Sequence, residues 1–343
     1  MDNDDDADPF GSYGLKPIRL EDKPVFDFYF STCSTRLSDY TFANSFIWRD
    51  SIHLRWRVIS DCLCVFANGD GGLTMLFPPV GPGDMAAALR HCLDICECYN
   101  SRAHLEHWTR IEYVSEEMLR KFPGDFVSTP MSGDYVYETR RMIDLAGGDL
   151  ASKRQARNRF ARRYHVRTED FAAGYIPRCM ALLGVWQEQA EQSAKPHLSV
   201  DFKRAKEIAA TADAMINAGA MDLRGMVLFA DDQLVGFTLG EQLDKDTCSI
   251  LIEKTNREFQ GSAQYIFSEF CRQYWASTAW CNVGDDWEIP SLAWTKQSYR
   301  PAIRHPKWVV RPSYAAAAAA ATSSLQGKHA AANSRPAEVD AAT

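Results

Sequence analysis

The sequence of 343 residues has no membrane-spanning segment, because no run approaches the roughly 18 consecutive apolar residues that such a helix needs. Its first ten residues carry five Asp and no apolar core, the opposite of a secretory signal. The ten cysteines include no Cys-x-x-Cys pair, and without an export signal we expect them to be thiols. We therefore expect a cytoplasmic protein.

An excess of positive charge is also absent. The chain has 38 Lys and Arg against 45 Asp and Glu, a net charge of −7, so any anion site has to be local. No P-loop, no Gly-x-Ser-x-Gly motif and no Ser/His/Asp order stands out. What is present is a globular composition, 46% hydrophobic and 24% charged, with a length that suits two domains.

Hydrophobic periodicity predicts a mixed succession of helices and strands. In the N-terminal half we expect helices at 21–31, 85–99 and 115–122, and strands at 52–58, 62–67, 73–77 and 104–108. In the C-terminal half we expect helices at 176–189, 202–217, 263–275 and 291–299, and strands at 225–230, 234–242, 247–253, 279–283 and 308–311.

The order of elements in the C-terminal half is that of GNAT-type acyltransferases. The free backbone N–H groups at the start of a helix make an anion site, and here the loop before the helix at 263 holds Arg257, Gly261 and Ser262. We predict these three as phosphate-binding residues. Glu258 stands where the usual pattern has a basic or amide residue, and an acid facing a pyrophosphate argues against ordinary acetyl-CoA binding.

Several longer motifs resemble one particular family. Residues 135–160 contain a Tyr-x-Tyr strand followed by Lys-Arg-x-x-x-Asn-x-Phe, the stretch GFTLGEQL precedes SILIEKTNREFQGSAQYI, and SLAWTKQSYRP lies near the end. FANSFIWRD at 42–50 is also typical of the family. The chain resembles the soluble, stand-alone proteins similar to the C-terminal domain of phosphatidylglycerol lysyltransferase.

This resemblance implies a fold of class α/β (α+β), with two GNAT-like units in tandem, each a mixed, mostly antiparallel sheet flanked by helices. We predict an acidic disordered tail at 1–15, an N-terminal unit at 16–134, a connecting strand and basic helix at 135–167, a C-terminal unit at 168–313 and an Ala-rich disordered tail at 314–343. Membrane-bound relatives pass an amino acid from aminoacyl-tRNA to a lipid headgroup, and related tandem proteins pass aminoacyl groups from tRNA to cell-wall precursors.

The resemblance thus implies an acyltransferase. The donor is aminoacyl-tRNA or an acyl-CoA, and the acceptor is a small molecule, a peptide or a lipid headgroup. The alternative is a non-catalytic protein that binds an anionic, phosphate-containing ligand on the same fold. This chain departs from the family pattern at Val283 and Gly284, which replace Arg and Glu, and at Ala293 and Trp294, which replace Arg and Lys.

A basic segment precedes the C-terminal unit. Seven cations and no acid lie between Asp149 and Glu169, and on a helix they point nearly all round. We predict that Lys153, Arg154, Arg157 and Asn158, three of them matching the family motif, bind phosphates of the donor. The alternative is a solvated helix between the units, paired with carboxylates.

Acid–base chemistry is predicted at two places. Asp286 beside Lys296 and Tyr299 can take a proton from an attacking amine while Lys or Tyr donates to the leaving group, with Asn282 as a binding residue; the simpler interpretation is an acidic loop capping a helix. Glu253 and its strand neighbour Glu241 each follow an apolar run, and a catalytic carboxylate and a structural ion pair remain equal alternatives.

A zinc site is not expected. Cys92 and Cys96 fall on the apolar face of a helix, where cysteine behaves as a small hydrophobe, although His91, Cys98 and His104 lie nearby.

Overall fold

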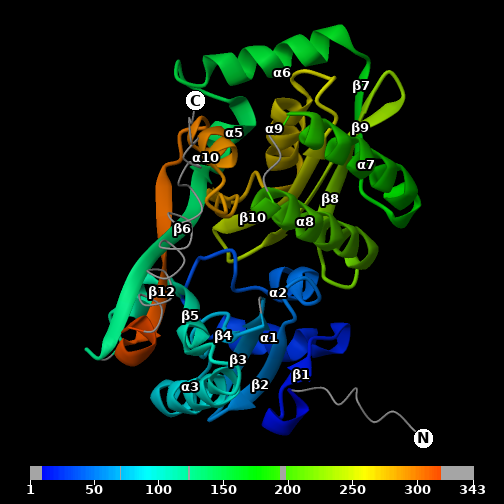
Figure 1. Cartoon of the computed structure of the whole chain (residues 1–343). Coiled ribbons are helices and arrows are strands. Elements are labelled where there is room, and N and C mark those ends of the chain that lie inside the picture. The colour runs from blue at the N-terminus through cyan, green and yellow to red at the C-terminus, as the bar shows by residue number, and fades with distance from the viewer. Residues whose placement is uncertain (1–9, 70, 123, 194–197, 318–343) are drawn as a thin grey trace, which may run out of the picture.

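The chain folds into two units joined by a short helical connection (Figure 1). The computed structural model describes residues 10–69, 71–122, 124–193 and 198–317. The N-terminal unit comprises η1 (Gly11–Tyr13), β1 (Lys16–Pro17), η2 (Leu20–Asp22), α1 (Lys23–Ser31), α2 (Phe42–Trp48), β2 (Arg55–Ile59), β3 (Cys62–Asn68), β4 (Leu73–Met75), α3 (Met85–Ser101), η3 (Glu106–Trp108), β5 (Ile111–Ser115), α4 (Glu116–Leu119) and β6 (Phe126–Glu138).

The connection and the C-terminal unit complete the fold. The connection consists of α5 (Thr139–Asp144) and α6 (Ala151–Arg163). The C-terminal unit comprises β7 (Val166–Asp170), η4 (Ala173–Tyr175), α7 (Ile176–Ser193), α8 (Leu198–Asn217), β8 (Arg224–Ala230), β9 (Gln233–Gln242), β10 (Thr247–Thr255), α9 (Ser262–Tyr274), β11 (Trp280–Asn282), α10 (Pro290–Gln297) and β12 (Ile303–Pro312).

The two units repeat one topology. In the first unit β2, β3 and β4 are antiparallel neighbours and β4 pairs parallel with β5 across α3. In the second unit β8, β9 and β10 repeat the antiparallel run, and β10 pairs parallel with β11 across α9. Two helices precede each run, α1 with α2 and α7 with α8. The expected fold of two GNAT-like units, each a mostly antiparallel mixed sheet flanked by helices, is confirmed.

The two units share one continuous sheet because they exchange their last strands. Within the described residues the strand order is β1-β2-β3-β4-β5-β12-β6-β11-β10-β9-β8-β7. Thus β12, the last strand of the second unit, pairs with β5 of the first, while β6 pairs with β11 of the second. The long β6–β12 ladder runs from one unit into the other along the left of Figure 1. Neither unit's sheet is complete without the other.

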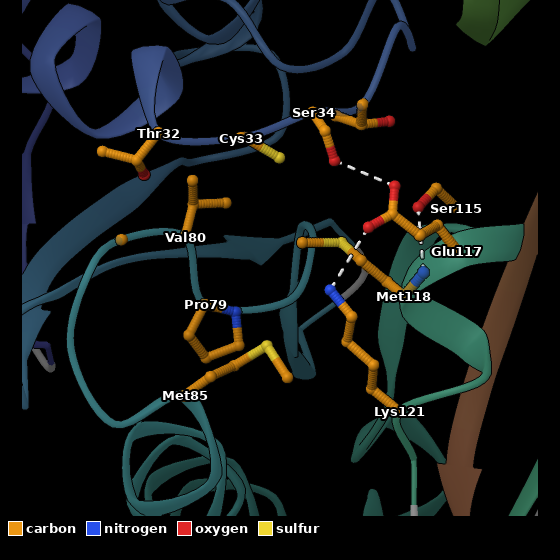
Figure 2. A pocket seen from close by; sticks show the side chains of 12 residues that line it. Thr32, Cys33, Ser34, Pro79, Val80, Met85, Ser115, Glu117, Met118 and Lys121 are labelled. Atoms are coloured by element: carbon orange, nitrogen blue, oxygen red, sulfur yellow. Dashed lines mark hydrogen bonds and ion pairs between the residues drawn. The ribbon is translucent and has the colours of Figure 1, made fainter.

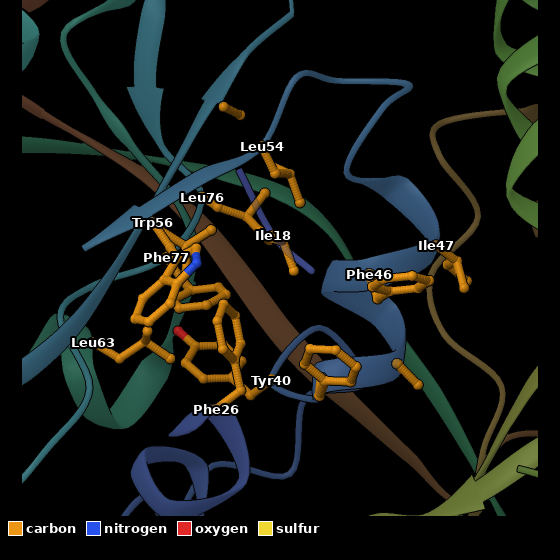
Figure 3. Close-up of a cluster of buried hydrophobic side chains, with 14 of the residues drawn as sticks. Ile18, Phe26, Tyr40, Phe46, Ile47, Leu54, Trp56, Leu63, Leu76 and Phe77 are labelled. Carbon is orange, nitrogen blue, oxygen red and sulfur yellow. The ribbon is translucent and has the colours of Figure 1, made fainter. Parts of the chain in front are cut away.

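Hydrophobic packing covers both faces of this sheet. In the C-terminal unit α9 packs on β8, β9 and β10, whereas α7 packs on β9 and β10 and contacts α8, which also packs on α2 of the first unit. Figure 3 shows aromatic side chains that fill the N-terminal core, where the rings of Phe26 and Trp56 meet edge to face at 5.3 Å. Such pairs contribute about 0.5–1.5 kcal/mol beyond their buried area. Among the described helices, none has the length and apolar character needed to cross a membrane.

Most of the expected elements are confirmed, but the strand expected at 104–108 is wrong. That stretch holds the 3-10 helix η3, and His104 has a left-handed φ of 55°, which does not continue a strand. The strand lies later, in β5, because Ile111, Val114 and Ser115 find partners on β12. That partner comes from the far end of the chain and is invisible to local pattern.

Both ends of the described chain belong to the fold. Phe10 is buried and stacks on Tyr99 with ring centroids 5.4 Å apart, although it lies in the segment 1–15 that we expected to be a tail. Ala315 is likewise buried. The remainder of the two predicted tails, 1–9 and 318–343, lies outside the described residues, and the unit boundaries stay predictions.

Helix α6 lies against the start of α9, and Gly261 makes this contact possible. Gly261 has a φ of +95°, and a Cβ there would stand 2.3 Å from the carbonyl oxygen of Ala156 and 2.9 Å from Cβ of Phe160. Both the backbone conformation and the space therefore require glycine.

We predict that Gly261→Ala destabilises the protein by about 2–4 kcal/mol, because it combines left-handed strain with a backbone clash. Urea unfolding followed by circular dichroism measures this loss. Gly184→Ala in α7 is the control, since a Cβ there meets nothing within 4 Å. That change should stabilise by about 0.5–1 kcal/mol. Equal effects of the two variants would contradict the proposed contact.

Candidate functional site

Strands β10 and β11 diverge in the middle of the C-terminal unit. Their pairing ends at Ser249 and Asn282, whereas β10 continues beside β9 as far as Thr255. Glu253 lies on the part of β10 that extends beyond its pairing with β11. Its Oε2 atom is buried and has no hydrogen-bond partner among the described residues. Burial raises the pKa of Glu253 to about 8, against the opposing charge of Lys254.

Tyr299 lies near enough to Glu253 to sense its charge, and Lys153 lies against the ring of Tyr299. Burial raises the pKa of Tyr299, and the negative charge of Glu253 adds to the shift, so the phenol stays protonated at neutral pH. Lys153 Nζ lies 4.5 Å from the centroid of the Tyr299 ring and 5.8 Å from that of Trp294. Burial alone lowers the pKa of Lys153, and no carboxylate pairs with it among the described residues. Trp294 is 71% exposed beside this group.

Together these four side chains offer a proton acceptor, a hydroxyl donor, a cation and an aromatic surface. They come from β10, α6, α10 and the residues after α10, so only the folded C-terminal unit together with the connecting helix α6 assembles them. An unpartnered buried carboxyl group is costly and in a native protein calls for a ligand or a reaction. We call Glu253, Tyr299, Lys153 and Trp294 the β10 centre.

The other predicted catalytic pair, Asp286 and Lys296, is held in internal hydrogen bonds. Asp286 accepts from the hydroxyls of Ser132 and Tyr135, each at 2.6 Å. Burial acts to raise the pKa of Asp286, but these hydrogen bonds outweigh it and the pKa is lowered, which makes a poor base. Lys296 Nζ donates to the carbonyl oxygens of Val283, at 2.6 Å, and Asp285. Burial lowers its pKa to about 8, against the charge of Asp285.

Asn282 belongs to the same internal network. Its amide donates to the carbonyl oxygen of Arg36 at 3.1 Å and to Asp134 at 2.8 Å, and its Oδ1 accepts from the N–H of Gly284. The side chain thereby ties the C-terminal unit to the loop after α1. The amide is buried and has no remaining donor aimed at a substrate.

Three of the predicted phosphate-binding residues of α6, Arg154, Arg157 and Asn158, are engaged in internal hydrogen bonds. Arg154 donates to the carbonyl oxygens of Leu145 and Gly147, and Arg157 donates to Ile143 at 3.1 Å and to Ser268 at 3.0 Å. These bonds satisfy carbonyl groups at the end of α5. The side-chain oxygen of Asn158 accepts from Arg157. Three further cations of the helix remain exposed and have no carboxylate partner among the described residues: Arg159, Arg162 and Arg163.

The loop before α9 is also closed by its own contacts. The N–H of Arg257 donates to the side chain of Gln189 at 3.0 Å, and the N–H of Ser262 donates to the carbonyl oxygen of Phe259 at 3.0 Å. Ser262 is buried, and Gly261 lies beneath α6. The structure therefore places Tyr299 near Glu253 on one side and Lys153 on the other, and places Arg257, Gly261 and Ser262 in a loop that is occupied by neighbouring protein.

Sequence reasoning missed a buried charge cluster at the junction of the units. Lys307 of β12 is 1% exposed, and its Nζ lies 2.5 Å from Asp39, 2.6 Å from Asp134 and 3.0 Å from Asp285. Burial raises the pKa of Asp39 to about 7, although Lys307 opposes this. Burial also acts on Asp134, but Lys307 outweighs it and the pKa is lowered. A single Lys in the run HPKWVV gave no sequence signal.

Glu241, the strand neighbour weighed beside Glu253, has a structural partner. Its carboxyl accepts from the hydroxyl of Thr41 at 2.7 Å, and Thr41 also caps α2. Burial raises the pKa of Glu241 to about 7. This side chain joins β9 to the N-terminal unit and is not part of the β10 centre.

The tandem topology is that of an acyltransferase-like protein built from two GNAT-like units. The chain belongs to the family described as phosphatidylglycerol lysyltransferase, C-terminal, which matches residues 30–311. The expected family is thereby confirmed.

Known proteins similar to this chain agree with the fold. A conserved protein of unknown function from Bacteroides thetaiotaomicron has a TM-score of 0.75 at 24% identity, over 86% of this chain and 98% of that one. The structure of L-PGS from Bacillus licheniformis has a TM-score of 0.55 at 13% identity, over 87% and 93%. An uncharacterized protein of Mycoplasmoides gallisepticum, MYCGA3080, is 26% identical over 186 residues, 52% of this chain. The chain spans about half the length of that curated relative, 56%.

Lys307→Met should destabilise the protein by about 3–5 kcal/mol at neutral pH, because it leaves three buried carboxyl groups without their cation. Urea unfolding measures the loss. Lys245→Met is the control, since Lys245 is 89% exposed and pairs with Asp246 at only 3.8 Å. Such surface pairs contribute about 0–1 kcal/mol. A loss for Lys307→Met no larger than the control's would contradict the role given to the cluster.

The contribution of Glu253 to the free energy of unfolding should decrease as pH rises. Its pKa is about 8 when folded against 4.5 ordinarily, so between these values the folded state binds more protons than the unfolded state and stability falls with increasing pH. Glu253→Gln should remove this contribution. The melting temperature of the variant, compared with that of the original protein at the same pH, should therefore increase from about pH 5, near the lower end of this window, to about pH 9, above its upper end. Glu288→Gln, which changes an exposed carboxylate, is the control, and a parallel pH dependence of both variants would refute the assignment.

Proposed function

We propose that the C-terminal unit transfers an acyl group, and specifically an aminoacyl group, from an activated ester to an amine or hydroxyl acceptor. The observation that supports this most directly is the buried Oε2 atom of Glu253, which has no hydrogen-bond partner among the described residues and lies near the protonated phenol of Tyr299. Membership of a lysyltransferase family supports the reaction class, and the β10 centre supplies the groups that such a reaction needs.

In the proposed reaction the acceptor N–H or O–H lies against Glu253. As the acceptor attacks the ester carbonyl, Glu253 takes its proton, a bond from nitrogen or oxygen to the acyl carbon forms, and the ester C–O bond breaks. Tyr299 gives its proton to the leaving oxygen, and Glu253 restores it through solvent. Lys153, which has no carboxylate partner among the described residues, stabilises the negative charge that develops at the carbonyl oxygen. No covalent enzyme intermediate is needed.

The exposed face of α6 suggests how a donor with phosphates is held. Arg159, Arg162 and Arg163 lie exposed on the helix whose first turn carries Lys153. Cations without carboxylate partners bind a phosphate backbone through counterion release, so this face suits the acceptor end of a charged tRNA. An acyl-CoA donor fits less well, because the loop that would receive its pyrophosphate holds Glu258 and lies beneath α6.

The test is donor turnover. The purified chain is incubated with a mixed pool of tRNAs charged with radiolabelled amino acids, and separately with acetyl-CoA, in the presence of phosphatidylglycerol vesicles, a dipeptide pool or free amines as acceptors. We expect loss of the aminoacyl ester and transfer of label to one acceptor class. Glu253→Gln should reduce the rate about 100-fold or more, as removal of a general base does.

The pH profile and two matched variants give the proposal its specificity. Below an apparent pKa near that of Glu253, about 8, the rate should rise with pH, because only the ionised carboxylate accepts a proton. Glu241→Gln, a buried carboxyl on the next strand, should keep the profile of the original protein. Arg159→Ala with Arg162→Ala should weaken tRNA binding and flatten its salt dependence.

The non-catalytic alternative has one observation in its favour: Asp286, Lys296 and Asn282 are all engaged in internal hydrogen bonds. If neither donor loses its ester or thioester, and Lys153→Met changes only how tightly tRNA or another phosphorylated ligand is retained, the chain is a binding protein. Trapping of an acyl group on a cysteine would also exclude the direct transfer proposed here.

A further inference from the structure

A hollow in the N-terminal unit has no part in the β10 centre. It has a volume of about 120 Å³ and lies between the loop after α1, the segment after β4, the start of α3, and the junction of β5 with α4 (Figure 2). Its lining includes Cys33, Ser34, Met85, Glu117, Met118 and Lys121. In the repeat, the same place in the second unit lies between the end of α7, the loop before α9 and the segment joining β11 to α10.

A phosphorylated cofactor does not suit this hollow. The start of α3 is the place where such a fold would bind a phosphate, but the carboxylate of Asp84 caps it and accepts from the N–H of Ala87 at 2.9 Å. Gly83 packs against backbone atoms of Ser60 and Asp61. An anion at this helix start would meet a carboxylate already in place, so the occupant has to be small and without a phosphate.

The rim of the hollow carries one acid and one base. The carboxylate of Glu117 accepts from the hydroxyl of Ser34 at 2.9 Å and from Lys121 Nζ at 3.3 Å, and both side chains are more than half exposed, at 55% and 53%. The hydrogen bond from Ser34 and the cation of Lys121 lower the pKa of Glu117, which is therefore ionised. Figure 2 shows these three side chains on one side of the hollow.

The opposite wall is apolar and rich in sulfur. Met85, Val80 and Pro79 face the hollow from this side, together with the thiol of Cys33, and Met118 points into it from the side that carries Glu117 and Lys121. Burial raises the pKa of Cys33, so the thiol is neutral. Thioether side chains adapt their shape to apolar groups. A cavity of about 150 Å³ in another protein accommodates benzene, so the space here suits an occupant whose apolar part has about five or six heavy atoms at most.

We propose that this hollow binds a free α-amino acid with an aliphatic or thioether side chain. The ammonium group lies at Glu117 and Ser34, the carboxylate lies at Lys121, and the side chain lies on Met85 and Met118. A zwitterion suits the rim because it presents both charges within one small group, replacing the exposed Glu117–Lys121 contact with two charge-assisted hydrogen bonds. The site is independent of the transfer proposed for the C-terminal unit.

The experiment is isothermal titration of the whole chain with L-leucine and L-methionine at neutral pH. Two leucine analogues test the need for both charges: 4-methylpentanoate lacks the ammonium group and isopentylamine lacks the carboxylate. We expect binding of at least one amino acid at millimolar concentration, and binding of either analogue to be weaker by about tenfold or more.

Variants locate the site. Glu117→Gln and Lys121→Gln should each weaken binding of the amino acid about tenfold. Glu116→Gln and Arg120→Gln change the neighbouring ion pair, 3.2 Å apart on the same short helix, and should leave binding unchanged. Glu253→Gln should also leave it unchanged, so failure of the transfer reaction is separable from failure of this site. Thermal unfolding of every variant checks that it is folded.

Three outcomes would overturn the proposal. They are the absence of binding for both amino acids at millimolar concentration, analogues that bind as well as L-leucine, and binding that survives Glu117→Gln combined with Lys121→Gln while the protein stays folded. Loss of binding in Glu116→Gln as large as that in Glu117→Gln would likewise place the ligand elsewhere.

Discussion

The contact on which the rest of the structure depends is the ammonium group of Lys307 among three carboxylates. Lys307 lies on β12, the strand of the second unit that pairs with β5 of the first. Its partners are Asp39 in the loop after α1, Asp134 on β6 and Asp285 in the loop after β11. A buried cation with three acids is stable only where every partner is held in place. The cluster therefore fixes the register of the exchanged strands, and through Asp285 it also fixes the loop that Lys296 and Asp286 hold from the other side.

The Asp286–Lys296 network and Glu253 lie in the same unit but have different surroundings. Asp286 and Lys296 are held by internal hydrogen bonds. These bonds lower the pKa of Asp286 and leave neither side chain free to exchange a proton with a substrate. Glu253 has the opposite surroundings: a buried oxygen without a partner and a raised pKa. Gly284 has a φ of +67°, and a Cβ there would lie 3.9 Å from Lys296 Nζ. The carbonyl groups on either side of Gly284, those of Val283 and Asp285, accept from Lys296.

Local sequence pattern predicted the order of elements and the family, because helix and strand periods and the motifs around 135–160 and 234–267 are local properties. It could not show which of the proposed site residues make internal hydrogen bonds in the folded protein. Arg154 and Arg157 resemble phosphate ligands in sequence, yet they satisfy carbonyl groups at the end of α5, since α5 and α6 fold back on each other. Lys307 and the position of β5 depend on strand exchange between segments about 200 residues apart in the chain, which periodicity does not encode.

The repeat also shows how the two units come to differ at the same position. Each unit has two parallel strands joined by a helix, and in each the N–H groups at the start of that helix are capped or covered by another part of the protein. In the first unit Asp84 caps α3 with its carboxylate. In the second, Gly261 has no side chain to cap α9, and α6 lies against it instead. Because α6 carries Lys153 at one end and exposed arginines at the other, covering the second helix start brings a cationic helix to the β10 centre. No such helix among the described residues covers the start of α3 in the first unit, and the hollow there keeps an apolar wall and a rim that carries Glu117 and Lys121.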